Sequence, residues 1–377
     1  MNSTQDIPDY VEAHREEAFA LLTELAQIPA PSNHEEKRAE FCRAWLKWQG
    51  ADDVYIDEAL NVVYPVGCDG DKPITVYMAH SDVVFPDLKP LPLRIDKNRL
   101  FCPGVGDDTA NVVALLTAAK YVIEKKLLPR NEGVLFVINA GEEGLGNLKG
   151  SRAIIERYGS RIKEFITFDG YAKNVTFRAV GSARYRVEIE TEGGHSFGKF
   201  GNRNAIACLA SLIDTLYQIK VPTGGKTTYN VGTISGGTSV NTIAQHAEML
   251  YEYRSDVPEH LETMEQSFRA AIEGCRANGL DVRVTLLGKR PCGIAIDETA
   301  QSALVSRAEK AVSRYFNLIP SHTSGSTDCN IPLSIGIPSV CVGCVSGGGA
   351  HTREEYVEID SLAPGLCTAL ELILSHF

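Results

Sequence analysis

The sequence predicts an α/β protein in which one domain interrupts another, and three observations on element order support this. Up to about residue 176, short apolar runs of strand character alternate with helical segments, as in a partly parallel sheet. From 177 to 290 the order is β-α-β-β-α-β, that of a ferredoxin-like unit. From 291 to 377 helices and strands alternate again. We therefore expect residues 1–176 and 291–377 to form a discontinuous domain. Its central sheet would be mixed, mostly parallel and flanked by helices, and residues 177–290 would form an inserted α+β domain.

The individual elements follow from hydrophobic periodicity. In the discontinuous domain it predicts helices over 11–28, 35–48, 108–124, after Gly146, over 303–315 and from 361, and strands over 61–66, 74–79, 134–139, 165–168 and 339–342. In the inserted domain it predicts strands over 185–190, 230–234, 249–254 and 282–287, and helices over 205–217 and 261–277.

Composition and charge limit the classes of function. The chain has 377 residues, of which 44% are hydrophobic, and its 37 basic and 48 acidic residues give a net charge of 37 − 48 = −11. This charge argues against nucleic acid or an anionic membrane as a partner and favours small molecules or peptides. The first residues show no basic segment followed by an apolar run, and no stretch of about 18 apolar residues occurs. We therefore expect a cytoplasmic protein.

The cysteines are scattered along the chain rather than grouped in a disulfide or zinc pattern. They lie at positions 42, 68, 102, 208, 275, 292, 329, 341, 344 and 367. In a protein without an export signal, reduced thiols are expected. The single pair Cys341 and Cys344 is interpreted as the end of a strand.

Polar groups that bind metal follow several predicted strands. The strand 74–79 leads into His80 and Asp82, and in α/β sheets ligands bind at the carboxyl ends of strands. Asp82 can orient His80 from the second shell of a metal site. Asp107 and Asp108 stand where a loop meets an apolar helix. Because a carboxylate has two oxygens, one of these acids can bridge two metal ions.

The remaining candidates come later in the chain. The strand 134–139 is followed by Glu142 and Glu143, the strand 165–168 by Asp169, and His351 follows three glycines. One glutamate can bind metal while its neighbour accepts a proton. Such a mixed nitrogen and oxygen set suits zinc or, less selectively, cobalt or manganese. Two metal ions about 3.5–4 Å apart are the arrangement found in aminopeptidases and related hydrolases.

Each motif also has an ordinary structural explanation. A histidine near an aspartate can be a loop feature, and adjacent acids can cap a helix. Placement at successive strand ends is what makes the set a candidate site.

The residues resemble the M20 metallopeptidase family, which includes peptidase T, glutamate carboxypeptidase, dipeptidases, aminoacylases and succinyl-diaminopimelate desuccinylase. Nine segments match in family order between about residues 78 and 360: AHSDVVFP, GVGDDTAN, NAGEEGLG, FDG, GGHSFGKFGNRNAI, SVNTIA, YEYRSD, SGSTDCNIPLSIGIPS and GGGAHTREEYVEI. The resemblance implies a zinc-peptidase-like catalytic domain and an inserted lid and dimerisation domain. It also implies two Zn²⁺ ions per subunit and a homodimer formed through the lid.

The resemblance assigns a role to each matching position. His80 and Asp169 would bind one ion, Glu143 and His351 the other, and Asp107 would bridge them. Glu142 would be the general base, Asp82 would orient His80, and the peptide bond Asp107–Asp108 would be cis. His195 would support the oxyanion in the partner's site. Substrate contacts would come from Asn241, Arg254, Gly325 and Ser326.

Without the resemblance, each of these positions has an ordinary structural explanation. The segment around His195 is a turn, and Asn241 is a polar residue at a strand end. Arg254 belongs to a surface ion pair, and the SGSTDCN segment caps a helix. The chain also departs from the family after the bridging Asp. Many members continue with Lys-Gly after the next residue, whereas Thr109 and Ala110 stand here.

The expected activity is cleavage of short peptides by an aminopeptidase or di/tripeptidase of the peptidase T type. The alternatives are an N-acyl amino acid amidohydrolase or a glutamate-type carboxypeptidase of the same family. A catalytically inactive binding protein is the hypothesis from another class. It would be expected to lack a ligand or the base, and this sequence has them all.

Overall fold

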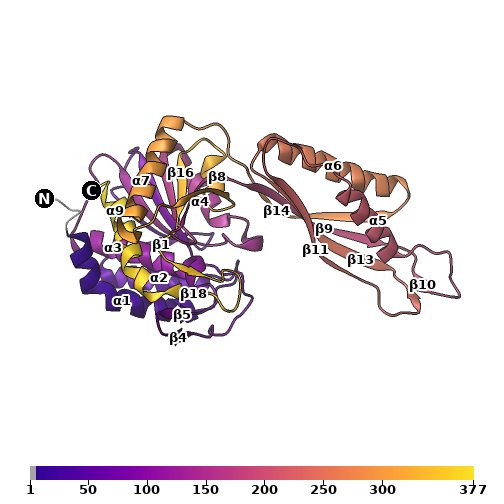
Figure 1. The fold of residues 1–377 in the computed structure, drawn as a ribbon, viewed down its shortest axis with the longest axis horizontal. Coiled ribbons are helices and arrows are strands. Elements are labelled where there is room, and N and C mark those ends of the chain that lie inside the picture. Colours follow the sequence, from indigo (N-terminus) through magenta and orange to yellow (C-terminus); the bar gives the residue numbers. More distant parts are fainter. Residues whose placement is uncertain (1–5) are drawn as a thin grey trace. The chain divides into compact units, whose positions relative to one another are not determined.

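The computed structural model describes residues 6–377. The expectation about an export signal concerns the first residues of the chain, part of which lies outside the described residues. The chain forms two units (Figure 1). Unit 1 comprises the chain up to Ala179 together with Ile294–Phe377, and unit 2 comprises Val180–Gly293. The boundaries expected from the sequence lie at 176/177 and 290/291.

Unit 1 contains an eight-stranded sheet in the order β1-β2-β6-β3-β7-β16-β8-β15. Its strands are β1 (Tyr55–Ile56), β2 (Val62–Val66), β3 (Ile74–His80), β6 (Gly133–Asn139), β7 (Ile162–Phe168), β8 (Asn174–Ala179), β15 (Ser321–Gly325) and β16 (Ser339–Val342). The central strands β6, β3, β7 and β16 run parallel, and β15 is parallel to β8. The other neighbouring pairs are antiparallel. The predicted mixed, mostly parallel sheet is confirmed.

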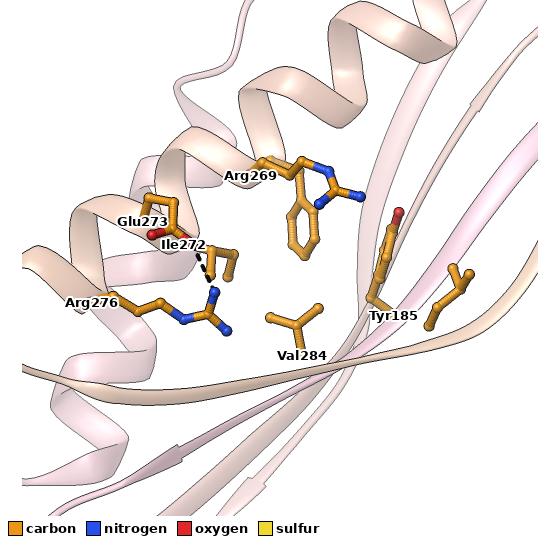
Figure 2. A pocket seen from close by; sticks show the side chains of 8 residues that line it. Tyr185, Arg269, Ile272, Glu273, Arg276 and Val284 are labelled. Carbon is orange, nitrogen blue, oxygen red and sulfur yellow. Dashed lines mark hydrogen bonds and ion pairs between the residues drawn. The ribbon is translucent and has the colours of Figure 1, made fainter.

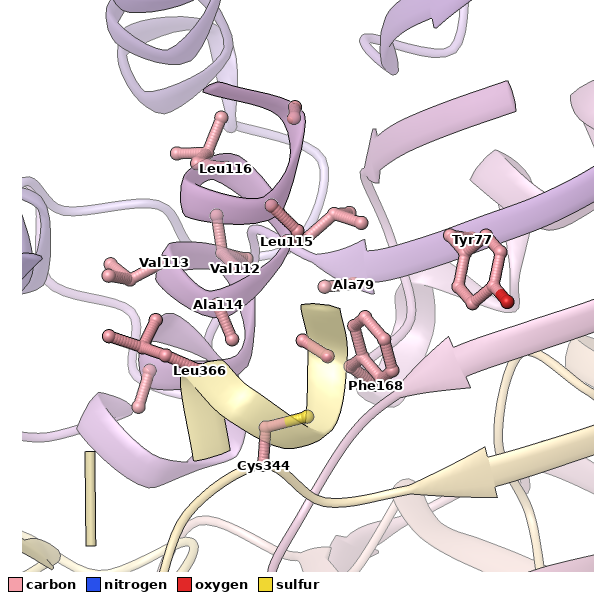
Figure 3. Close-up of a cluster of buried hydrophobic side chains, with 14 of the residues drawn as sticks. Tyr77, Ala79, Val112, Val113, Ala114, Leu115, Leu116, Phe168, Cys344 and Leu366 are labelled. Carbon is pink, nitrogen blue, oxygen red and sulfur yellow. The ribbon is translucent and has the colours of Figure 1, made fainter. Parts of the chain in front are cut away.

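Helices cover both faces of this sheet because its central strands are apolar on both sides. In β3, Tyr77 and Ala79 belong to one buried cluster, while Val76 and Met78 belong to another. The first cluster contains residues of α1 (Ile7–Gln27), α2 (Glu36–Gln49), α3 (Ala110–Glu124), α7 (Glu298–Phe316) and α9 (Leu362–Leu374). The second contains residues of α4 (Lys149–Tyr158) and α8 (Asn330–Leu333). Figure 3 shows α3 and α9 meeting side chains of β3 and β7 in the first cluster.

A small antiparallel sheet in unit 1 was not predicted. It is formed by β4 (Arg94–Asp96), β5 (Arg99–Phe101), β17 (Gly347–Gly348) and β18 (Tyr356–Glu358), in the order β17-β18-β5-β4. Its strands have two or three residues each, which is too short for a period to be recognised. The pairing of β18 with β5 brings the segment near His351 to the segment near Asp107.

Unit 2 is a four-stranded antiparallel sheet in the order β11-β13-β9-β14, with two helices packed on one face. Its main elements are β9 (Gly181–Glu190), α5 (Ala205–Tyr217), β11 (Thr227–Gly236), β13 (His246–Ser255), α6 (Pro258–Ala277) and β14 (Asp281–Arg290). A two-stranded ribbon joins β10 (Gly194–His195) to β12 (Thr242–Ile243). In β13 alternate side chains are buried, which is the period expected of a sheet with one covered face.

Two remaining sequence expectations concern thiols and membranes. All ten cysteines carry free thiols in the described part of the chain, and Cys341 lies in β16 as predicted. Among the described residues, the helices are too short or too polar to cross a bilayer.

At the amino ends of the central strands, Glu132 joins three parts of unit 1. It accepts a hydrogen bond from Thr75 at 3.0 Å, pairs with Lys163 at 2.8 Å and contacts His376 at 2.8 Å. Burial alone would raise the pKa of Glu132, but the hydrogen bonds from His376 and Lys163 outweigh it. They lower the pKa to about 2 from its ordinary value of 4.5.

We predict that Glu132 contributes to stability above its ordinary pKa and that this contribution is lost as the pH falls from about 4.5 towards 2. Glu132→Gln should lower the free energy of unfolding at pH 7 by about 1.5–3 kcal/mol and flatten its decline in this window. Denaturant unfolding at several pH values measures both effects, with exposed Glu58→Gln as the control. The prediction would be contradicted if the free energy of unfolding fell equally steeply with pH in Glu132→Gln and in wild type.

Candidate active site

Five side chains with metal-binding atoms gather at the carboxyl ends of the central strands in unit 1. His80 is the last residue of β3 and is fully buried, and Asp169 directly follows β7. Asp107 lies in the turn Val105–Thr109 that precedes α3, with a non-helical backbone conformation. Glu143 follows β6 after a tight turn, ahead of the 3-10 turn Gly144–Gly146. His351 lies between β17 and β18. The sequence placed these residues in different loops, and the structure brings them together.

The two carboxylate oxygens of Asp107 face different histidines. Its Oδ1 lies 3.0 Å from His80 Nε2, and its Oδ2 lies 3.2 Å from His351 Nε2. On the first side, Asp169 Oδ1 is 4.0 Å from His80 Nε2. On the second side, Glu143 Oε1 is 3.0 Å from His351 Nε2. Asp107 therefore stands between a group formed with His80 and Asp169 and a group formed with His351 and Glu143.

Electrostatics in this cluster are dominated by crowded acids. Burial, together with the negative charge of Asp107, raises the pKa of Asp169 well above its ordinary value. Burial also raises the pKa of Glu143 to about 7. Asp107 differs: burial alone would raise its pKa, but hydrogen bonds to His351 and His80 hold it below its ordinary value. A carboxylate cluster of this kind is stabilised by positive charge placed among its oxygens.

Asp82 holds the segment that carries the two glutamates. Its Oδ1 accepts the backbone N–H of Glu142 at 3.0 Å, and its Oδ2 accepts that of Glu143 at 2.9 Å and the hydroxyl of Ser32 at 2.6 Å. His80 Nδ1 lies 3.5 Å from Asp82 Oδ1 and 3.1 Å from the Asp82 carbonyl oxygen. Asp82 thus holds the backbone of Glu142 and Glu143 and also contacts His80. Glu142 itself is buried.

Asp108, the second of the two adjacent acids considered from the sequence, supports the site together with Asn111, which was not predicted. Asp108 Oδ2 accepts the backbone N–H of His80 at 2.8 Å, and its Oδ1 accepts a hydrogen bond from Asn111 at 2.6 Å. Asn111 also donates to the carbonyl of Gly170 at 3.0 Å and accepts from the backbone N–H of Cys344 at 2.7 Å. The bond Asp107–Asp108 is cis, as the resemblance implied.

Arg38 is a second unpredicted support, and its guanidinium is completely buried behind the site. It donates to the carbonyl of Ser81 at 2.9 Å and to the hydroxyl of Thr109 at 3.0 Å. It therefore joins α2 to the segments that carry His80 and Asp107. The sequence signal was a basic residue on the buried stripe of an amphipathic helix.

The donor set fits divalent metal ions. Imidazole nitrogens and carboxylate oxygens are the ligands of zinc in catalytic sites. Donor atoms of His80, Asp107 and Glu143 lie within 4.8 Å of one another, as do those of His80, Asp108 and Asp169. Both Asp108 oxygens already accept hydrogen bonds, so Asp169 is the better donor beside His80.

The predicted residues of unit 2 fall into two places. His195 lies in β10 and is exposed; its Nδ1 faces the backbone N–H groups of Phe197 and Gly198 at 3.3 and 3.2 Å. Asn241 adjoins it, because its carbonyl accepts the backbone N–H of Ser196 at 2.9 Å. Arg254 is near the far end of β13 and forms a two-pronged pair with Glu252, at 3.0 and 3.1 Å.

Gly325 and Ser326 belong to unit 1, where Gly325 ends the edge strand β15 and Ser326 follows it. The sequence predicted a loop at this point. The strand was missed because its residues, SHTSG, show no apolar alternation.

Other hollows and clusters lie in unit 2. A cavity of about 400 Å³ is lined by residues of α6 and the sheet. Figure 2 shows Tyr185, Ile272 and Val284 in its lining. The two arginines beside it are paired, Arg269 with Glu265 and Arg276 with Glu273, each at 2.7 Å.

A separate cluster of Glu188, His246 and Glu248 lies on the open face of the sheet and is half-buried. His246 contacts Glu190 at 2.8 Å, and Glu248 lies 3.7 Å from Arg186. These are cross-strand ion pairs of the ordinary kind.

Comparisons with known proteins agree with the geometry. The model of peptidase family M20/M25/M40 matches residues 76–375. The uncharacterized protein YqjE of Bacillus subtilis is 28% identical over 366 residues, which cover 90% of this chain and 92% of that protein. A probable carboxypeptidase of Paracoccidioides brasiliensis is 27% identical over 257 residues, covering 62% of this chain and 56% of that protein.

Solved structures share the fold. The aminopeptidase PepT of Bacillus cereus has a TM-score of 0.72 at 22% identity, covering 95% of this chain and 98% of that one. A tripeptidase of Staphylococcus aureus has a TM-score of 0.75 at 22% identity, covering 95% and 97%. The Bacillus subtilis protein YxeP, described as a dinuclear metal-binding peptidase, has a TM-score of 0.64 at 16% identity, covering 97% and 100%.

The position of Asp107 between two histidines leads to a prediction about metal content. Asp107→Ala removes both oxygens that face the two groups, so we expect it to prevent paired metal binding. Metal analysis of zinc-loaded, dialysed protein should give at most one ion per chain for Asp107→Ala and two for the control Asp96→Ala, which alters an exposed residue of β4. Two ions retained by Asp107→Ala would contradict the bridging position.

Proposed function

The chain belongs to peptidase family M20/M25/M40 and is a metallopeptidase-type hydrolase, and from this premise we propose that it cleaves the peptide bonds of short peptides with two zinc ions. In this proposal His80 and Asp169 hold one ion, Glu143 and His351 hold the other, and Asp107 contributes one oxygen to each. Cobalt or manganese are possible substitutes with the same ligands.

The observation that carries the proposal is the orientation of Asp107. Its two oxygens lie 3.0 and 3.2 Å from nitrogens of two different histidines. A buried carboxylate that served structure alone would not require an imidazole on each side and further carboxylates beyond them. The raised pKa values of Asp169 and Glu143 support the same conclusion, because they mark negative charge without enough positive charge near it.

Two divalent ions, when bound, lower the pKa of an attacking water and polarise the scissile carbonyl. Glu142 is proposed as the general base that takes the proton of this water and delivers it to the leaving amine. Its position supports this role, since it is buried beside Glu143 and its backbone N–H is fixed by Asp82 at 3.0 Å. Asp82 would thereby orient the base as well as His80.

Short peptides are proposed as substrates because the FDG segment around Asp169 and the small lid look closest to peptidase T. The fold likeness to an aminopeptidase and a tripeptidase supports this choice. The alternative is an N-acyl amino acid amidohydrolase or a glutamate-type carboxypeptidase of the same family. The relative described as a probable carboxypeptidase favours the second of these.

Unit 2 is proposed as a dimerisation domain in a cytoplasmic homodimer. The exposed side chain of His195, adjacent to Asn241, supports the proposed role of His195 in stabilising the oxyanion in a partner's site. Arg254 would have to leave Glu252 to bind a substrate carboxylate, and Gly325 and Ser326 remain proposed contacts within unit 1.

We predict that Glu142→Gln retains both metal ions but lowers kcat by about 10²–10⁴-fold, because it removes the proton acceptor while keeping the shape of the side chain. Steady-state kinetics and metal analysis of the same preparation measure the two effects. Glu156→Gln, on the exposed side of α4, is the matched control. Turnover of Glu142→Gln near the wild-type rate would remove Glu142 from the mechanism.

The substrate proposal is tested with one panel containing free tripeptides, N-acetylated amino acids and peptides with a C-terminal amide. The zinc-loaded chain should hydrolyse free tripeptides, lose activity when the N-terminus is acetylated, and become inactive when metal is removed. Faster cleavage of acetylated amino acids would favour the amidohydrolase instead. Loss of cleavage on C-terminal amidation alone would favour the carboxypeptidase.

A further inference from the structure

Glu355 is a buried acid whose side chain accepts hydrogen bonds from the loop that carries Asp107. It is 1% exposed and belongs to the segment between His351 and β18. Its Oε2 accepts the backbone N–H of Gly104 at 2.9 Å. Its Oε1 accepts the backbone N–H of Gly106 at 2.8 Å and that of Asp107 at 2.7 Å. One carboxylate therefore binds three N–H groups within four consecutive residues.

This arrangement is a backbone nest for an anion, in which N–H groups of a turn converge on one negative group. The loop can form it because Gly104 has a φ of 76°, in the region that favours glycine. A carboxylate that accepts N–H hydrogen bonds is held more firmly than a neutral acceptor would be. The orientation of the Asp107 backbone is thus fixed by Glu355.

Glu355 also joins the segment that carries Asp107 to the segment that carries His351. The backbone carbonyl of Glu355 accepts the N–H of Cys102 at 3.1 Å, so both its main chain and its side chain hold the segment 102–107. His351 is four residues earlier on Glu355's own segment, and its Nε2 lies 3.2 Å from Asp107 Oδ2. Movement of Glu355 would therefore change the distance between His351 and Asp107.

We propose that Glu355 is a positioning residue that sets the affinity of the site for the metal ion held between Asp107 and His351. It touches no proposed ligand side chain and acts through the backbone of the Asp107 loop. The inference rests on the proposed two-metal function. Partners that orient metal ligands in this indirect way typically contribute about 10–100-fold to metal affinity.

The test compares Glu355→Gln with wild type and with Glu354→Gln. Gln keeps one acceptor oxygen but presents an N–H₂ group where Glu355 presents its second oxygen, so at least one of the three N–H groups loses its partner. Glu354 is the neighbouring residue, and its side chain is 79% exposed. Zinc affinities are measured on metal-depleted protein by competition with a chelator of known affinity, and thermal unfolding of the metal-depleted protein is measured alongside.

The expected result is a loss of about 10–100-fold in affinity for at least one of the two ions in Glu355→Gln, with both affinities unchanged in Glu354→Gln. At saturating zinc, kcat and KM should return to within a few-fold of wild type. A variant that only destabilises the fold would lower the unfolding temperature and leave both affinities unchanged, and this outcome overturns the inference.

Two further outcomes keep the inference and the proposed function apart. If wild type takes up fewer than two ions, the two-metal function fails and the inference fails with it. If wild type binds two ions and Glu355→Gln binds both equally tightly, only the inference fails. If Glu355→Gln does not fold, Glu355→Asp, which keeps the charge on a shorter side chain, replaces it in the same measurements. The expected and the contradicting results stay the same.

Discussion

The carboxylate of Asp107 is the group on which the rest of the site depends, because it is shared between two histidines that come from distant parts of the chain. His80 ends a central strand and His351 lies in a loop beyond β17, and Asp107 is the side chain that contacts both. Several supports serve this one position. Asp108 and Asn111 tie the turn after it to β3 and Gly170, and Glu355 holds its backbone from the other side. The side chains of Asp108, Asn111 and Glu355 that make these contacts are buried, which favours a fixed geometry at Asp107.

The fold supplies this position through the apolar central strands. Because β3, β6 and β7 are buried and parallel, their carboxyl ends meet at one edge, and the polar residues that follow them cannot avoid one another. The crowding costs stability, since burial and like charge raise the pKa values of Asp169 and Glu143. Groups that destabilise a fold in this way are typical of functional sites.

The sequence was sufficient for β2, β3, β6, β7 and β16, because apolar strands are recognised by their period, but not for β1 and β8 of the same sheet. Of the five clustered side chains, it placed His80, Glu143 and Asp169 after predicted strands, Asp107 before a helix and His351 after glycines. It was insufficient for β15, whose residues are polar, and for β4, β5, β17 and β18, which are too short for a period. Glu355 and Arg38 were missed for another reason. Their partners are mostly backbone groups, and the direction of a backbone N–H or carbonyl leaves no trace in the pattern of side chains.

The most direct test of this account is anomalous X-ray diffraction from crystals of the zinc-loaded protein, because it locates each ion and its ligands without reference to activity. The account predicts two anomalous peaks about 3.5–4 Å apart, with the Asp107 carboxylate between them, one next to His80 and the other next to His351. A single peak, or two peaks of which neither is coordinated by Asp107, would contradict it.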